Sequence, residues 1–336
     1  MKIEKYNSLD DALTLEIEDF LISANSLFNP LFSSPLWALR LKKMFKFNFI
    51  FYIVRNDENI QALLLVFSGY RGYQKIDKLP KIFKKLAIVL SKLFFGYHAW
   101  FNSIVFLKEE SNENKKEIKK LIYLKLSKYR RVFNSPIELN DYKFFPEKKS
   151  FLWGTMIIDI SNNSYNEIFS KFKRNAKRPI KESLSKGFHI RELSSINLVE
   201  YVQWLIENQS ETGKSNRIDS DLFNYDLKIF DKKNYIYKVF IAYSENRILG
   251  SISVWGFGGF VTEKGVYRSK LSKKNGYFEQ DLLKDWIVRF CIDNDIHSYD
   301  LAGYNPNKNL SKKEEGIKKF KEKFGGKTLE YENIYS

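Results

Sequence analysis

The residues best suited to chemistry lie near the carboxyl end of the chain, in two neighbouring segments. Residues 316–326, GIKKFKEKFGG, are typical of a basic helix that ends at a pair of glycines. Residues 299–303, YDLAG, are typical of a short strand that breaks at its glycine. A strand that ends in a glycine-containing turn and leads into a basic helix often binds an anion. We therefore expect a site for a negatively charged substrate here.

A second concentration of positive charge lies in residues 171–186, with Lys177, Arg178 and Lys181 at its centre. Basic residues spread around a helix favour contact with phosphates or with a tRNA backbone. A solvated surface helix is the alternative interpretation. The aromatic residues Trp255 and Tyr267, together with Tyr304, could stack on a base or a sugar, although such side chains also pack in cores.

Two other kinds of chemistry are not expected. The three histidines, His98, His189 and His297, are far apart along the chain, and none has a partner at ligand spacing. A metal site or a Cys–His nucleophile pair is therefore not predicted. Residues 212–215, TGKS, imitate the end of a phosphate-binding loop. However, Asn208 stands where that loop requires its first glycine, and no apolar strand precedes it.

The elements that position these residues occur as a repeat. Apolar residues 51–54 and 60–66 flank a polar turn, and residues 240–243 and 248–254 repeat the arrangement. Each pattern predicts a β-hairpin, and each is followed by a glycine-containing segment and a helical pattern. Two copies predict two similar domains of mixed α/β class. Pro136 and Pro146 interrupt the periodicity, so we place the domains at residues 1–148 and 149–336.

In the second half of the chain, helical and strand patterns alternate. Strands are predicted at residues 155–160, 188–193, 265–269 and 298–301, and helices at residues 165–172, 174–186, 198–208, 220–230 and 279–293. In the last of these helices, periodicity predicts burial of Leu282, Leu283, Trp286, Ile287 and Phe290.

Residues 79–95 form an amphipathic helical pattern in the first half. Its apolar positions are Ile82, Phe83, Leu86, Ala87, Leu90, Leu93 and Phe94, and lysines fill the other face. Two interpretations follow. The helix could lie on an anionic membrane, or it could pack against its own domain with solvated lysines.

Composition limits the setting. A chain of 336 residues suits two domains, and a net charge of +16 favours phosphate-bearing partners such as RNA, nucleotides or an anionic membrane surface. A lysine-rich surface without such partners is the alternative.

The single cysteine, Cys291, excludes an intrachain disulfide and fits a reducing cytoplasm. Early acidic residues and the lack of a long uncharged stretch predict neither a secretory segment nor a membrane span. We expect a cytoplasmic protein, with peripheral contact at the inner face of the membrane as an option.

Several of these segments together resemble one family. Residues 177–183 and Gly187, KRPIKES followed by glycine, resemble the Arg-Arg-x-Ile-Arg-x-Ala…Gly element of the FemAB-like transferases. These are the peptidoglycan-bridge aminoacyltransferases and their relatives in the GNAT superfamily. Three further segments match that family in order and spacing, namely Leu282-Leu283-x-x-Trp286, Tyr299-Asp300-x-x-Gly303 and Gly316-Ile317-x-x-Phe320-Lys321-x-x-Phe324-Gly325-Gly326. Ser33-Ser34-x-x-Trp37 resembles its N-terminal Gln-Ser-x-x-Trp.

The resemblance implies two tandem GNAT-like domains and acyl transfer onto an amine. In the bridge-forming members, aminoacyl-tRNA donates an amino acid to a cell-wall precursor. The family's Phe-Lys pair falls on Phe320 and Lys321. Lys321 would then stabilise the oxyanion of the tetrahedral intermediate, and Phe320 would line the site. Asp300 would either orient the amine or cap the turn after its strand. Lys177, Arg178 and Lys181 would hold phosphates of the donor or acceptor.

The chain departs from the bridge-forming members at the acceptor site. Those members place an arginine and a tyrosine after the segment that matches residues 211–217, and here only Arg217 could substitute. Arg40 takes the place of a lysine that follows the family's tryptophan, which is Trp37 here. A different acceptor amine, on a surface sugar or a lipid, is therefore an option.

Two alternatives remain. An acetyl-CoA-dependent N-acetyltransferase usually carries Gln/Arg-x-x-Gly-x-Gly/Ala, and the nearest segment here is Lys273-x-x-Gly276-x-Phe278, whose last residue is bulky. Either enzyme would use its acyl donor as a co-substrate, without a permanently bound cofactor. The other alternative is a basic RNA-binding module that lacks catalysis. Neither an aromatic RNA-recognition signature nor a zinc knuckle supports it.

Overall fold

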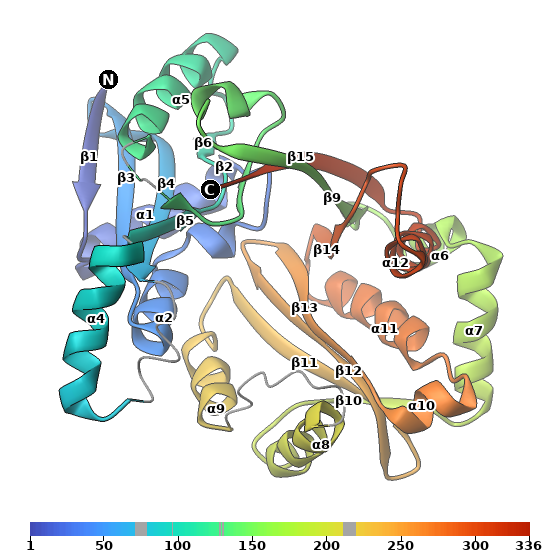
Figure 1. The fold of residues 1–336 in the computed structure, drawn as a ribbon. Helices are drawn as coiled ribbons and strands as arrows, with labels where there is room; N and C mark the ends of the chain where they lie inside the picture. The colour runs from blue at the N-terminus through green and yellow to red at the C-terminus, as the bar shows by residue number, and fades with distance from the viewer. Residues whose placement is uncertain (71–78, 96, 128, 130, 211–219) are drawn as a thin grey trace. The chain divides into compact units, whose positions relative to one another are not determined.

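The computed structural model describes residues 1–336 except 71–78, 96, 128, 130 and 211–219 (Figure 1). The chain forms two compact units, one of residues 1–153 with 330–336 and the other of residues 154–329. Each unit is built around a mixed β-sheet with helices, which is the α/β class that the sequence pattern predicted.

The first unit contains a sheet in the order β1-β3-β4-β5-β7. Strands β5 and β7 pair in parallel, whereas the other neighbours in this order are antiparallel. Its elements are β1 (Lys2–Tyr6), α1 (Asp11–Ser23), β2 (Ala24–Asn25), η1 (Pro30–Ser33), α2 (Pro35–Phe45), β3 (Asn48–Asn56), β4 (Asn59–Tyr70), α4 (Lys81–Phe95), β5 (Tyr97–Phe101), β6 (Val105–Leu107), α5 (Asn112–Leu126), β7 (Arg131–Val132), β8 (Ser135–Ile137) and η2 (Asp141–Phe144).

The second unit contains strands in the order β10-β11-β12-β13-β14-β9-β15, and here β13 and β14 pair in parallel. Strand β9 begins in the first unit and β15 ends in it. The elements are β9 (Lys149–Asp159), α6 (Tyr165–Lys171), α7 (Arg174–Ser185), β10 (His189–Glu192), α8 (Leu198–Ser210), α9 (Ser220–Ile229), β11 (Tyr235–Ser244), β12 (Arg247–Phe257), β13 (Phe260–Arg268), α10 (Lys270–Asn275), α11 (Glu279–Asp293), β14 (Ser298–Tyr304), α12 (Lys312–Glu322) and β15 (Lys327–Tyr335).

The predicted hairpin repeat is confirmed in detail. In each hairpin a two-residue turn joins the strands, and its first residue, Asp57 or Glu245, has a left-handed backbone with φ of 52° or 53°. In each hairpin the second strand carries a β-bulge shortly after the turn, where one residue has no partner on the first strand. This residue is Gln61 in β4 and Leu249 in β12. The two sheets also share one order of pairing, with three antiparallel steps followed by a parallel one. The units are therefore two copies of one topology.

Helices cover both faces of the second sheet (Figure 1). Helix α11 packs against α7 and against strands β11 and β12, and its Leu283 and Ile287 belong to the same apolar core as Ile252 and Val254 of β12. Helices α8 and α9 pack on the other face, with α9 against β11. Trp286 does not join this core as predicted, because it lies on the outer side of α11 and is 42% exposed.

Helix α4 differs from α5 in the same unit. Helix α5 buries its apolar residues Ile118 and Ile122. Helix α4 instead leaves Phe83 and Leu86 more than half exposed, and Leu90 is also exposed. On its other side α4 packs against β4, with Ala87 and Ile88 partly buried, so both interpretations of residues 79–95 stay predictions. In the described part of the chain, no helix combines the length and apolarity that a membrane crossing needs.

Candidate functional site

The candidate site forms where the two parallel strands β13 and β14 part. Within the described residues 260–304, their pairing ends at Thr262 and Asp300, although both strands continue. Each strand carries a bulge beyond that point, β13 at Gly265 with a φ of 76° and β14 between Asp300 and Gly303. Ligands of α/β folds usually bind outside the carboxyl ends of parallel strands. The end of the β13–β14 pairing is therefore a candidate ligand-binding position.

Asp300 is buried at the parting and held by three donors. Its carboxylate accepts hydrogen bonds from the hydroxyls of Thr155 and Thr262, the latter at 3.3 Å, and from the backbone N–H of Ala302 at 2.8 Å. Burial raises the pKa of this carboxyl above its ordinary value, although the bond from Thr155 opposes the shift. A carboxylate accepts up to about four hydrogen bonds. Asp300 can therefore orient one more donor, such as an amine.

Lys321 reaches the bulge of β14 from helix α12. Its Nζ donates hydrogen bonds to the carbonyl oxygens of Ala302 at 2.8 Å and Gly303 at 2.7 Å. Two successive carbonyls can turn to one cation because Ala302 adopts a left-handed backbone with a φ of 62°. The predicted break at Gly303 is thus wrong, since β14 runs on to Tyr304 and the irregular residue is Ala302.

The Lys321 ammonium is nearly removed from solvent, with 9% of the residue exposed. Burial lowers its pKa to about 8, because desolvation outweighs the attraction of Glu263. At pH 7 the group is therefore still mostly protonated. An ammonium has three N–H donors, and the two carbonyls take two of them. Across the described residues no acceptor takes the third, which leaves one donor for a substrate oxygen.

A buried ion pair lies behind this cation. Glu263 of β13 accepts hydrogen bonds from the ammonium of Lys284 on α11 and from the hydroxyl of Tyr299, and each of these residues is at most 3% exposed. Burial, followed by the charge of Glu263, raises the pKa of Tyr299 well above its ordinary value. Glu263 raises the pKa of Lys321 and Lys284 lowers it, so the two charges of the pair act on this pKa in opposite directions.

Phe320 lies beside a second ion pair. Lys323 pairs with Asp281 of α11, and its Nζ lies 4.1 Å from the centroid of the Phe320 ring. The Phe320 ring is partly buried and lies edge-on to Phe324, with 5.5 Å between the ring centroids. The structure therefore brings Phe320, Lys321 and Asp300 into one region, as the resemblance implied, but their roles remain predictions.

The predicted aromatic residues have mainly packing roles. Trp255 shares a cross-strand row with Thr262, which pairs with Asp300, but its ring packs 4.1 Å from Tyr237. Tyr304 is 3% exposed and leaves no room for a side chain at Gly154. Tyr267, half-buried on β13, accepts a hydrogen bond at its carbonyl from Gln280.

The predicted phosphate ligands lie on helix α7. Arg178 and Lys181 are exposed, opposite the buried Ala176 and Ile180. Lys177 donates a hydrogen bond to the carbonyl of Ser170 at 2.8 Å. These three cations therefore share the solvent side of one helix instead of surrounding it.

The remaining predicted residues fall elsewhere. Trp37 and Arg40 belong to α2 of the first unit, where the Arg40 guanidinium lies 5.0 Å from the Trp37 ring centroid and both residues are buried. Arg217 lies outside the described residues. Among the described residues, no group of three or more His, Cys, Asp or Glu could hold a metal ion.

Sequence reasoning missed four polar residues of this region, Thr155, Thr262, Glu263 and Lys284. Glu263 was missed because residues 260–264 were not predicted to be strand, although β13 begins at Phe260. Lys284 carried a usable signal, since it stands directly after Leu282 and Leu283 and lies on the same buried side of α11.

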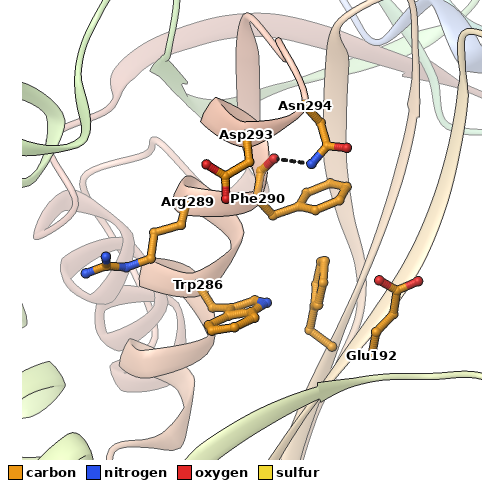
Figure 2. A pocket seen from close by; sticks show the side chains of 7 residues that line it. Glu192, Trp286, Arg289, Phe290, Asp293 and Asn294 are labelled. Atoms are coloured by element: carbon orange, nitrogen blue, oxygen red, sulfur yellow. Dashed lines mark hydrogen bonds between the residues drawn. The ribbon is translucent and has the colours of Figure 1, made fainter.

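A separate cavity of about 210 Å³ lies at the carboxyl-terminal half of α11 (Figure 2). Its lining residues are Glu192, Phe240, Trp286, Arg289, Phe290, Asp293 and Asn294. None of them belongs to the region around Lys321. Arg289 is already engaged, because it pairs with Asp285 and lies 3.7 Å from the Tyr165 ring centroid. We assign no role in the proposed reaction to this cavity.

The whole chain superposes on known structures. FemX matches with a TM-score of 0.66 over 98% of this chain and 96% of its own, at 12% sequence identity. This chain has the FemX fold. L-PGS from Bacillus licheniformis matches with a TM-score of 0.53 over 96% of this chain and 91% of its own, at 13% identity.

A tandem GNAT protein from the clavulanic acid biosynthesis pathway matches with a TM-score of 0.53 over 99% of this chain and 98% of its own, at 9% identity. The fold predicted from the sequence, two tandem GNAT-like domains, is thus confirmed. No family model and no curated protein matches the chain. At such low identities the FemX fold alone is established, and function has to be argued from the site.

Proposed function

We propose that the protein is an N-acyltransferase that moves an aminoacyl group from aminoacyl-tRNA onto an amine of a phosphate-bearing cell-envelope precursor. The observation that carries this proposal is the buried Lys321 ammonium, which is fixed at the β14 bulge with one N–H donor left for a substrate. The FemX fold supports the reaction class. In this proposal the protein works in the cytoplasm, with peripheral contact at the inner face of the membrane.

The proposed reaction needs one cation that binds the carbonyl oxygen and one hydrogen-bond acceptor that orients the amine. The amine attacks the carbonyl carbon of the donor ester, a C–N bond forms, and negative charge builds on the carbonyl oxygen. The third N–H of Lys321 binds that oxygen, and Asp300 accepts a hydrogen bond from the amine. The intermediate then breaks its C–O bond. The leaving ribose oxygen takes the proton that the amine loses, so the products are an amide and uncharged tRNA.

The start of helix α11 favours aminoacyl-tRNA over acyl-CoA as the donor. A helix N-terminus can bind the pyrophosphate of a nucleotide cofactor. Here the first turn holds the buried carboxylates of Glu279 and Asp281, and Glu279 pairs with Arg268 at 2.6 Å. These carboxylates already stabilise the helix end and would repel a phosphate. Acetyl-CoA-dependent transfer to a sugar or lipid amine is the second candidate, because a tandem GNAT protein has the same fold.

A donor screen tests the proposal. The protein is incubated with bulk tRNA charged with labelled amino acids, or with labelled acetyl-CoA, in the presence of amine acceptors that include nucleotide-linked amino sugars and peptides. Mass spectrometry then identifies any amide. We expect product with charged tRNA. Product with acetyl-CoA alone would establish the second candidate, and tRNA binding without product from either donor would favour a non-catalytic RNA-binding module.

The rate should fall as pH rises through about 8. Lys321 acts in its protonated form, and its pKa is lowered to about 8. The unfolded chain keeps the ordinary lysine pKa of about 10.4, so between these values the unfolded state binds more protons and this group's contribution to stability rises with pH. Activity and stability should therefore change in opposite directions. Rate profiles and melting temperatures from pH 6 to 10 check this, and a rate that stays level to pH 10 would contradict it.

Removing two cations from α7 should weaken tRNA binding. We expect Arg178→Ala with Lys181→Ala to reduce the slope of log affinity against log salt by about 1.4 to 1.8, because each lost phosphate contact removes about 0.7 to 0.9. Filter binding of tRNA at several salt concentrations measures the slope. Lys312→Ala with Lys313→Ala, two exposed lysines of α12, serves as the matched control. Equal slopes for both double variants would contradict the assignment.

A further inference from the structure

Helix α4 presents an apolar stripe to solvent. Within the helix Phe83, Leu86 and Leu90 follow one another at steps of three and four residues, so these three lie on one face. They are 61%, 58% and 41% exposed, in that order, and Leu79, two residues before the helix, is 41% exposed. Single exposed apolar side chains are normal on a protein surface, but a continuous stripe of this kind marks an interaction surface.

The charge on this helix defines what could cover the stripe. Helix α4 contains Lys81, Lys84, Lys85 and Lys92 and no aspartate or glutamate. Among residues 83–90, the part of α4 whose side chains the structure describes, the partly buried positions are Lys84, Ala87 and Ile88, and the helix packs against β4. The exposed surface is thus a ridge of large apolar side chains on a helix whose only charges are positive.

We propose that α4 docks the protein on an anionic lipid bilayer. A helix with lysines beside a stripe of Phe and Leu can lie in the membrane interface, with the stripe among the acyl chains and the lysines at the phosphates. The net charge of +16 adds long-range attraction to such a surface. A second copy of this chain fits poorly, because it would bring two sets of four lysines together without a carboxylate on either helix.

This inference rests on the first unit alone and does not depend on the proposed acyl transfer. It predicts where the protein meets the membrane, namely through Phe83 and Leu86, whatever reaction it catalyses. The lysines alone would give membrane binding that salt abolishes. Insertion of the apolar stripe adds a contribution to the affinity that salt does not screen.

Vesicle flotation with the full chain tests the proposal. At about 0.1 M salt we expect binding to vesicles of equal parts phosphatidylglycerol and phosphatidylcholine, and at least tenfold weaker binding to phosphatidylcholine alone. Phe83→Ser with Leu86→Ser should reduce binding by at least tenfold. The matched control is Ile196→Ser with Val199→Ser, two apolar residues that are 93% and 78% exposed in the second unit, and it should bind like wild type.

A fluorescent label tests the depth of insertion. The native Cys291 is buried, so Leu86→Cys offers one accessible thiol for an environment-sensitive dye. Its emission should shift to the blue on anionic vesicles, and the same dye at Val199→Cys should not respond. Failure of wild type to bind, equal binding by both double variants, or self-association of wild type that Phe83→Ser with Leu86→Ser removes would overturn the proposal.

Discussion

Replacing Lys321 with methionine should lower turnover by about 10²- to 10³-fold while the protein stays folded. Losing one donor to an oxyanion typically costs that much in rate, because the developing negative charge then lacks one of its stabilising hydrogen bonds. Lys321 is the residue to test since its buried ammonium has a donor left after binding the carbonyls of Ala302 and Gly303. Single-turnover rates with the donor identified by the screen measure the chemical step itself.

The matched control is Lys313→Met, which removes an exposed lysine from the same helix and should leave turnover unchanged. Lys321→Arg adds a second test. An arginine stays protonated above pH 12, so any activity that this variant retains should no longer fall near pH 8. A Lys321→Met variant with normal turnover and normal stability would end the catalytic assignment. Loss of turnover together with loss of folding would instead mean that Lys321 only holds the bulge.

The parts of this fold that depend on neighbouring residues could be read from the sequence. Both hairpins were predicted because a polar turn between two apolar runs determines its own pairing. The basic helix and its glycine stop were predicted for the same reason, and Gly325 does adopt a left-handed backbone with a φ of 72°. Local patterns of this kind need no knowledge of the rest of the chain.

The features that escaped prediction depend on contacts between distant residues. The strand was expected to break at Gly303, yet the irregular residue of the bulge is Ala302, whose left-handed backbone is stabilised by hydrogen bonds to Asp300 and Lys321. Likewise, Lys284 is buried and Trp286 is not, the reverse of what their polarity suggests. The buried lysine is tolerated only because Glu263, 21 residues earlier, supplies the opposite charge.

The same ion pair supports the second large prediction. Replacing Lys284 with methionine should lower the melting temperature of the second unit by about 10 °C. The variant leaves the Glu263 carboxylate buried without its cation, which typically costs about 3 to 5 kcal/mol. For a unit of this size each kcal/mol lowers the melting temperature by about 2 to 4 °C. Calorimetry measures the unfolding transition of the second unit. Because the chain has two units, this transition must be followed as a peak separate from that of the first unit.

The double variant Glu263→Gln with Lys284→Met should recover most of this loss. Glutamine carries no charge and can still accept the hydrogen bond from Tyr299. Lys186→Met, which breaks an exposed pair with Glu182, controls for loss of a lysine charge and should change stability by less than about 1 kcal/mol. If the double variant melts as low as Lys284→Met, an unpaired carboxylate is not the cause of the instability.

The pair should also be visible in the pH dependence of the rate. In Lys284→Met the positive charge that lowers the pKa of Lys321 is gone, whereas Glu263, which raises that pKa, remains. The fall in rate should therefore move to a pH above about 8, measured at a temperature where the variant is still folded. Loss of stability by itself would not move the fall in rate to a higher pH. If the rate of the folded variant still falls near pH 8, the Glu263–Lys284 pair stabilises the unit without changing the pKa of Lys321.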